Sequence, residues 1–504
     1  MHNIVENVRK GLSKKVIKNI KSIERLYKPP EKDFLPNSTI NATFTIDSND
    51  LIKNYSLQKT NKSDTTPIST NNEINLESEV VNLQDNDVNK LLKSVYKLSS
   101  NGVYNDSLWH RYAQRLRLIS SLLHPTDIVT VFYSFGKIRY KDTHLFNTLF
   151  PILVKNLHTI SATGLSIIMN SMKKLEIRNY DILDLITNEF LLKNDKANIQ
   201  DIALVANSLS FFNMYHIKFW NSLYKLILIR NSQIDPLQAS LLISSVAKLD
   251  IRNVLMLRLL KRRLRPAIEK NELSPELVSL VLHSLTKLDF EAKHFYNSCY
   301  NSFHHFILQD KVDLQGIVLY LYTSICILEP NLQMVERCLN TLNKSRESLK
   351  SYKILKLKYI IDHLQHKHQN FINDLNEDLQ FFIKFIKDQK IKQSKKMPRW
   401  CYEMSLILKD CGVKHEKNIY FDYLRADIYI KDFNFVILCA GPYSYYTKSH
   451  QLNKFTQIHQ STLSLKGYNI GIIPYYEWNR LKTRDDKINY LNTFGQLSSL
   501  TLLN

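Results

Sequence analysis

The chain has 504 residues, enough for two or more folded units or for one long array of repeats. It carries 68 Lys and Arg against 47 Asp and Glu, a formal net charge of +21, which favours a polyanionic partner such as nucleic acid or an anionic membrane surface. No stretch approaches 18 consecutive apolar residues, so the sequence predicts no transmembrane helix. Glycine occurs only 10 times and neither GxGxxG nor GxxxxGK is present, so we expect no cofactor.

The N-terminal segment divides into two parts. Residues 1–30 place Lys and Arg on one side and Val, Leu and Ile on the other, as a basic amphipathic helix that Pro29 and Pro30 end. This pattern is typical of a mitochondrial presequence, with a surface helix as the alternative. Residues 31–82 are rich in Asn, Ser, Thr and Asp, a composition that buries no core and predicts a disordered linker.

A repeat occupies the middle of the chain. Short motifs of the form SVYKL or SVAKL recur at intervals of 37 to 40 residues, and they begin at Ser94, Ser134, Ser171, Ser208, Ser245, Ser284 and Ser324. Apolar residues six and three positions before each serine, and one and four after it, form one helical stripe. A second amphipathic segment follows each motif. The pattern predicts an α-solenoid of about seven helix pairs over residues 83–385.

Two further positions of the repeat are candidates for RNA contact. The residue before each serine is polar and varied: Lys93, Tyr133, Asn170, Asn207, Ser244, His283 and Thr323. The third residue after it is lysine in five of seven copies: Lys97, Lys137, Lys174, Lys248 and Lys287. A varied hydrogen-bonding side chain beside a lysine suits single-stranded RNA read about one base per repeat. The alternative is a solvated face whose lysines interact favourably with the helix C-termini.

The period changes after the repeats. Residues 386–418 read as a basic linker and a helix. Strands are then expected within 419–430, 433–441 and 468–478, with helices at 451–467, ended by a glycine, and at 483–494, capped by a threonine. These elements predict a small α/β domain.

This C-terminal segment resembles a RAP domain over residues 419–495. The resemblance rests on Asp427 in its strand, on a strand ending at Gly441-Pro442, and on the IPYYEW stretch at residues 473–478. The repeats resemble the heptatricopeptide repeats that accompany this domain in apicomplexan mitochondrial proteins. The resemblance implies organellar RNA as the partner and a fold similar to restriction-endonuclease-like nucleases.

The nuclease chemistry implied by that fold lacks residues in this sequence. In such nucleases an Asp and a second carboxylate hold a divalent metal that activates water. Asp427 matches the first carboxylate and is a weak catalytic candidate, but Leu438 and Ala440 stand where further carboxylates are expected. We therefore expect a pseudo-nuclease with neither catalysis nor a metal site. The aromatic residues offer stacking surfaces for bases instead, or form the core of the small domain: Tyr445, Tyr475 and Trp478.

The sequence thus predicts a mitochondrial RNA-binding protein that acts in RNA stability, RNA processing, or assembly of ribosomal RNA and the mitoribosome. Its expected partners are organellar transcripts or ribosomal RNA, with mitoribosomal proteins as further partners. Two alternatives stay open. One is a metal-dependent ribonuclease whose ligands include Asp422, Asp432 or Glu477. The other is a protein-binding helical scaffold, because solenoids bind peptides as readily as RNA.

Overall fold

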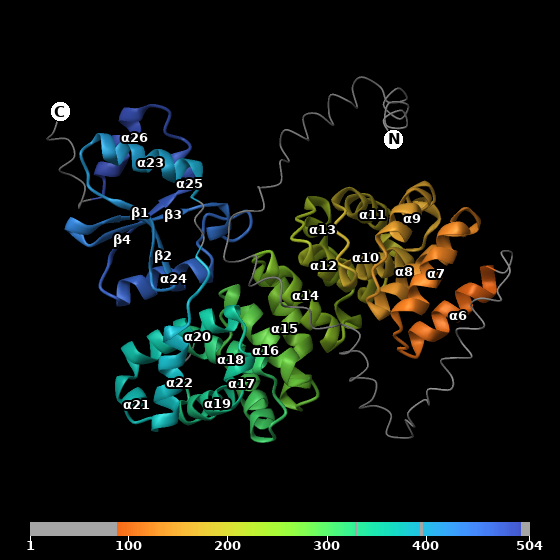
Figure 1. The fold of residues 1–504 in the computed structure, drawn as a ribbon, viewed down its shortest axis with the longest axis horizontal. Helices are drawn as coiled ribbons and strands as arrows, with labels where there is room; N and C mark the ends of the chain where they lie inside the picture. The colour runs from red at the N-terminus through yellow and green to blue at the C-terminus, as the bar shows by residue number, and fades with distance from the viewer. Residues whose placement is uncertain (1–87, 328–329, 394–396, 495–504) are drawn as a thin grey trace.

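The computed structural model describes residues 88–327, 330–393 and 397–494. The expected targeting helix at residues 1–30 and the expected linker at 31–82 lie outside this part of the chain. The described residues form a long array of paired helices followed by a small α/β domain, as the sequence predicts (Figure 1).

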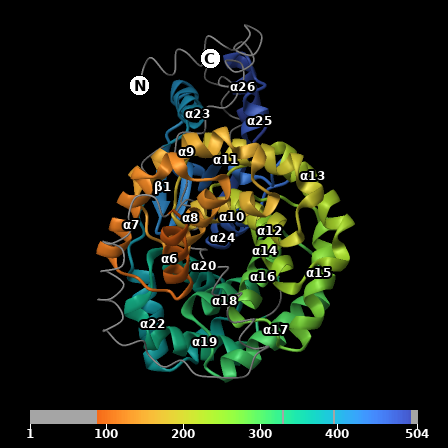
Figure 2. The ribbon, with the colours of Figure 1, turned by 90° about the vertical axis from the view of Figure 1, so that its right-hand side faces the viewer.

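The helical array consists of eight helix pairs in the described residues. The inner helices are α6 (Val88–Ser100), α8 (Pro125–Ile138), α10 (Ala162–Lys174), α12 (Ile199–Phe211), α14 (Pro236–Lys248), α16 (Pro275–Lys287), α18 (Leu314–Ile327) and α20 (Ser351–Lys367). The outer helices are α7 (Asp106–Leu118), α9 (Thr143–Lys155), α11 (Tyr180–Leu192), α13 (Ile217–Ile229), α15 (Val254–Glu269), α17 (Lys293–Leu308), α19 (Leu332–Lys344) and α22 (Glu377–Asp388), with the short α21 (Gln369–Asn373) before α22. Figure 2 shows the pairs winding into a ring-like superhelix.

Local sequence signals set the boundaries of each pair. The outer helices are capped by side chains that recur every 37 residues: Asn105, Asp142, Asn179, His216 and Asn253. Each of these side chains accepts a hydrogen bond from a backbone N–H of the first turn. The inner helices end at residues with positive φ, again 37 apart: Arg139, Glu176, Asn213 and Asp250. The 37-residue period is therefore a period of caps and turns.

The inner helices are almost wholly buried in the middle of the array. In α12, every residue from Asp201 to Ser210 is buried. Each inner helix from α10 to α18 packs on the inner helices before and after it, so it has no broad solvent-facing side. A helix buried in this way needs small and polar residues that fit between neighbours.

An eighth pair extends the array beyond the seven expected. Helix α20 packs on α18, and α22 packs on both α19 and α20. The serine motif used to find the repeat is absent from α20, where Ile360 and Ile361 occupy the corresponding stretch.

The C-terminal domain is built on a four-stranded sheet in the order β1-β2-β3-β4. Strands β1 (Glu416–Phe421) and β2 (Leu424–Ile430) form a hairpin around Asp422, which has a φ of 61°, and β3 (Phe435–Ala440) runs antiparallel to β2. Strand β4 (Asn469–Pro474) is parallel to β3. Its connection from β3 contains α24 (Lys454–Leu465), which ends before Gly467 at φ +87°. The remaining helices are α23 (Arg399–Asp410), α25 (Tyr475–Trp478) and α26 (Arg484–Asn492), the last capped by Thr483 as predicted.

The two faces of this sheet bury different neighbours. Leu424, Val436 and Leu463 belong to the apolar core that continues from the solenoid. The other face packs with α23, α25 and α26, so the helix expected within the linker is part of the domain core. Among the described residues, no helix is both long and apolar enough to cross a lipid bilayer.

Candidate nucleic-acid interface

The structure fixes the register of the repeat from its helix ends. Gly102 after α6 and Arg139 after α8 both have positive φ and are 37 residues apart, whereas the serine motifs of these two copies are 40 residues apart. Tyr96 is therefore the counterpart of Tyr133, and the two rings stack with centroids 5.8 Å apart. The sequence assignment of Lys93 and Lys97 to the RNA-facing positions of the first copy was wrong by three residues. Both lysines are exposed on α6.

The ninth residues of the inner helices form a row, which we call the inner row. It comprises Tyr96, Tyr133, Asn170, Asn207, Ser244, His283, Tyr322 and Tyr359, so Thr323, the residue expected in the seventh copy, is one residue out of register. In the central copies these side chains lie in the tight interior of the superhelix, where Ser244 and Asn170 are 4% and 9% exposed. Asn207 accepts a hydrogen bond from Lys173 Nζ at 2.6 Å, which joins α12 to α10. That Asn170, Asn207 and Ser244 read RNA bases stays a prediction. All three side chains are buried in the folded protein.

The lysines three residues after the motif serine are less buried. They lie at the C-terminal ends of the inner helices, on one rim of the superhelix, and we call them the rim lysines: Lys137, Lys174, Lys248 and Lys287. Two of them contact the preceding inner helix, because Lys137 Nζ donates to Ser100 O at 3.3 Å and Lys287 Nζ donates to Ala247 O at 2.7 Å. These bonds place a cation at a helix C-terminus, where the helix dipole favours it.

The loops after the inner helices add further cations to the same rim. Arg139, Lys141 and Arg178 are exposed there, and Lys141 and Arg178 line an open groove with Tyr180 and Phe150. Farther along, Arg252 donates to Leu288 O at 2.8 Å and to Asp289 O at 3.0 Å. Sequence reasoning missed this row, although cations at residues 141, 178 and 252 follow the repeat period.

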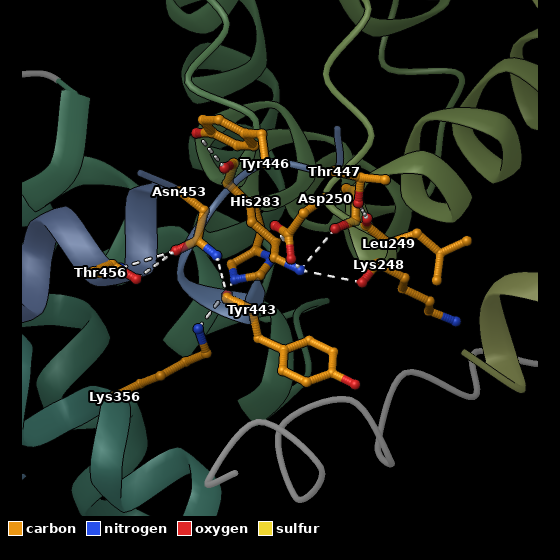
Figure 3. Close-up of polar contacts among 12 residues, drawn as sticks. Lys248, Leu249, Asp250, His283, Lys356, Tyr443, Tyr446, Thr447, Asn453 and Thr456 are labelled. Atoms are coloured by element: carbon orange, nitrogen blue, oxygen red, sulfur yellow. Dashed lines mark hydrogen bonds and ion pairs between the residues drawn. The ribbon is translucent and has the colours of Figure 1, made fainter. Parts of the chain in front are cut away.

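The C-terminal domain docks on this rim through the segment that follows β3. Tyr446 Oη donates to Lys287 O at 3.0 Å, Thr447 N donates to Asp250 O at 2.9 Å, and the Thr447 hydroxyl donates to Leu249 O (Figure 3). Two bonds within the domain brace the segment, from Asn453 Nδ2 to Tyr443 O and from Asn453 N to Ser444 O, both at 2.8 Å.

A second contact joins the domain to α20. Asp362 accepts a hydrogen bond from Tyr423 Oη at 2.7 Å and pairs with Lys466 Nζ at 2.7 Å. Lys358, 1% exposed at its side chain, pairs with Asp422 at 2.6 Å. Asp422 therefore serves the hairpin turn and the domain contact.

Basic side chains gather where the domain meets the inner helices. Lys356 Nζ of α20 lies 3.0 Å from His283 Nε2 of α16 and 3.9 Å from the centre of the Tyr322 ring. Burial, together with nearby Lys287, lowers the pKa of Lys356 to about 7. Burial and the neighbouring lysines lower the pKa of His283 well below its usual value, so its imidazole is neutral and accepts from the ammonium. Burial and Lys287 also lower the pKa of Lys248 to about 8.

The predicted aromatic stacking residues of the C-terminal domain occupy different environments. Trp478 is 1% exposed and donates its indole N–H to Glu403 Oε2 at 3.1 Å, so it is a core residue. Tyr445 is buried at 5% exposure and packs against Tyr476 with ring centroids 5.6 Å apart. Tyr475 is partly exposed, whereas Tyr443, at 40%, is the more open ring beside the solenoid.

Asp427, the carboxylate expected to bind metal in a nuclease, makes its contacts within the domain. Asp427 Oδ1 pairs with Arg425 Nη2 at 3.0 Å, and Oδ2 accepts from Cys439 N at 2.8 Å on the neighbouring strand. Burial raises the pKa of Asp427, and Arg425 opposes that shift. The side chains of Leu438 and Ala440 are apolar and buried. In the described part of the chain no three His, Cys, Asp or Glu side chains cluster as metal ligands.

Comparison with known families gives two matches. Residues 437–494 match the RAP domain, and residues 56–294 match the RNA-editing substrate-binding complex 6 protein family. The second match spans the first part of the helical array, and the first covers the domain from β3 to α26. No curated protein is similar enough to the chain to give a match. The α/β unit that the fold sets apart from the helical array is therefore a RAP domain.

Proposed function

We propose that this protein binds single-stranded RNA along the rim of its solenoid and acts in the editing or processing of organellar RNA. The observation that carries the proposal is the row of rim lysines, extended by the loop cations at residues 139, 141, 178 and 252. Cations at the repeat period suit the regularly spaced phosphates of one strand. The RAP domain docks on the same rim, so a strand following the rim reaches both domains.

The family matches and the charge support this proposal. One matched family is named for an RNA-editing substrate-binding complex, which makes RNA the partner class to test first. The net charge of +21 suits a polyanion. A mitochondrial location is part of the proposal and rests on the basic amphipathic pattern of residues 1–30.

The proposed action is binding without cleavage. Both oxygens of Asp427 are engaged by Arg425 and by the backbone of Cys439, and apolar Leu438 and Ala440 stand where further carboxylates are expected. In a metal-dependent nuclease, these positions supply the ligands that activate water. The protein would then hold RNA for other enzymes.

A second candidate function is protein binding by the outer helices of the array. Three apolar residues at repeat-equivalent positions near the ends of outer helices are 75–80% exposed: Leu118, Leu192 and Ile229. Contiguous exposed apolar side chains are typical of protein contact surfaces, and Leu192 and Ile229 lie on the successive outer helices α11 and α13. This surface is separate from the rim, so a scaffold role is compatible with RNA binding.

The test is ultraviolet crosslinking of the tagged protein in its own cells, followed by sequencing of the attached RNA. The proposal predicts a compact footprint, of about seven to ten nucleotides for one base per repeat, on organellar transcripts or ribosomal RNA. A variant with Lys137, Lys141, Lys174 and Arg178 changed to Gln should lose most of the crosslinks. Protein recovered with protein partners but without crosslinked RNA would favour the scaffold instead.

A further inference from the structure

We propose that a backbone phosphate of the RNA binds at the junction between the solenoid and the RAP domain. The junction site consists of Lys248, His283, Lys287 and Lys356 on three inner helices and Tyr443 on the RAP domain. This inference rests on the proposed function and deepens it, because it makes both domains hold the same strand.

The charge of the junction site is the first argument. Lys287 pairs with Asp250 at 3.3 Å, and Lys454 pairs with Asp289 at 2.9 Å, so these two lysines have carboxylate partners. Lys356 has none among the described residues; its contacts are a neutral imidazole and an aromatic ring. An ammonium that is 6% exposed and lacks a carboxylate is strongly disfavoured, and a phosphate oxygen would supply the missing anion.

The repeat itself shows that the fold does not need a lysine at residue 356. Lys356 is the sixth residue of α20. The sixth residue is leucine in the four inner helices before it: Leu204, Leu241, Leu280 and Leu319. Each of these leucines packs in the array with at most 9% exposure. A buried lysine at this position of α20 therefore lowers the stability of the fold relative to leucine. Its presence despite this cost indicates a role in binding.

Tyr443 supplies the second half of the site. Its ring is 40% exposed, while the neighbouring Tyr445 and Tyr446 are buried. The bonds of Asn453 to Tyr443 O and Ser444 O hold the backbone of this turn, and in Figure 3 the Tyr443 ring lies between the side chains of Lys356 and Lys248. An aromatic ring on a braced turn beside a cation suits a base stacked next to its own phosphate.

The experiment measures binding of a fluorescent 20-nucleotide single-stranded RNA of mixed sequence to the full chain at several salt concentrations. The test variants are Lys356→Leu, which installs the residue that the array uses elsewhere, and Tyr443→Ala at an exposed position. The matched controls are Lys225→Leu on the exposed surface of α13 and Tyr402→Ala, an exposed tyrosine of α23. Inorganic phosphate is added as a competitor, to separate a site for any phosphate from one that needs the RNA strand.

The proposal predicts that Lys356→Leu weakens binding about tenfold and makes the negative slope of log K against log salt shallower by about 0.7, the value for one phosphate contact on a single strand. It predicts that Tyr443→Ala weakens binding about fivefold or more and that both controls bind like the wild type. Wild-type affinity for both test variants, with strong binding by the parent, would overturn the junction site and leave the proposed function standing. No RNA binding by the wild type would overturn both.

Discussion

Replacing Lys356 by leucine should change how the stability of the protein depends on pH. The pKa of this lysine is about 7 in the folded protein and 10.5 in an unconstrained chain. Between these values the unfolded chain binds more protons than the folded one, so the free energy of unfolding rises with pH. From pH 7 to pH 9 the rise attributable to Lys356 is about 2 kcal/mol, from 1.36 kcal/mol per pKa unit with the folded group half protonated at the start.

The assay is urea denaturation followed by tryptophan fluorescence at pH 7, 8 and 9 for the wild type, Lys356→Leu and the exposed control Lys225→Leu. Comparing the rise with pH, rather than the stability at one pH, cancels any change in packing at the substituted site. Lys248, whose pKa is about 8, contributes equally to all three proteins. An equal rise in Lys356→Leu and in the wild type would refute the burial argument on which the junction site depends.

Three further substitutions test the packing. Gly136→Ala places a Cβ 2.8 Å from the Cβ of Ser171. The free energy of unfolding should fall by about 1 kcal/mol, because the overpacking outweighs the gain in helix propensity. A denaturation curve that shows no loss of stability would contradict the close approach of these two helices. Asp362→Asn should speed hydrogen exchange in residues 416–430, because it removes the charged contacts of Asp362 with Tyr423 and Lys466 on the RAP domain. Such a contact is worth about 1–3 kcal/mol. Unchanged exchange would count against this docking contact. Trp478→Phe should lower the free energy of unfolding by about 1 kcal/mol, because the hydrogen bond to Glu403 is lost, and should leave RNA affinity unchanged. Reduced RNA affinity in a folded variant would show that Trp478 stacks on RNA directly.

The repeat architecture could be predicted from the sequence because caps, turns and apolar stripes share one period. The errors arose where a local motif imitated that period. SVYKL at residue 94 shares four of its five letters with SVAKL at residue 245 but lies three residues out of register, and α20 belongs to the array without the motif. Cap positions, which depend on backbone geometry, locate the copies better than the motif does.

The candidate site was less predictable, because it depends on which elements lie next to one another. A helical wheel of one repeat separates a core stripe from a solvent face, and on it Asn170 and Asn207 look exposed. In the superhelix the adjacent inner helices cover that face. Lys356 and Tyr443 are 87 residues apart in the sequence, and the docking of the RAP domain on the rim places them on one site. No pattern within either segment reports that juxtaposition.

The central claim is that RNA lies along the rim and reaches the RAP domain. The most direct test is to crosslink a single-stranded RNA to the purified full chain and identify the modified residues by mass spectrometry. Our account predicts crosslinks in the loops that follow α8 and α10, near Lys141 and Arg178, and at Tyr443 in the junction site. Crosslinks confined to the outer helices, or absent under conditions where the protein is folded, would contradict it.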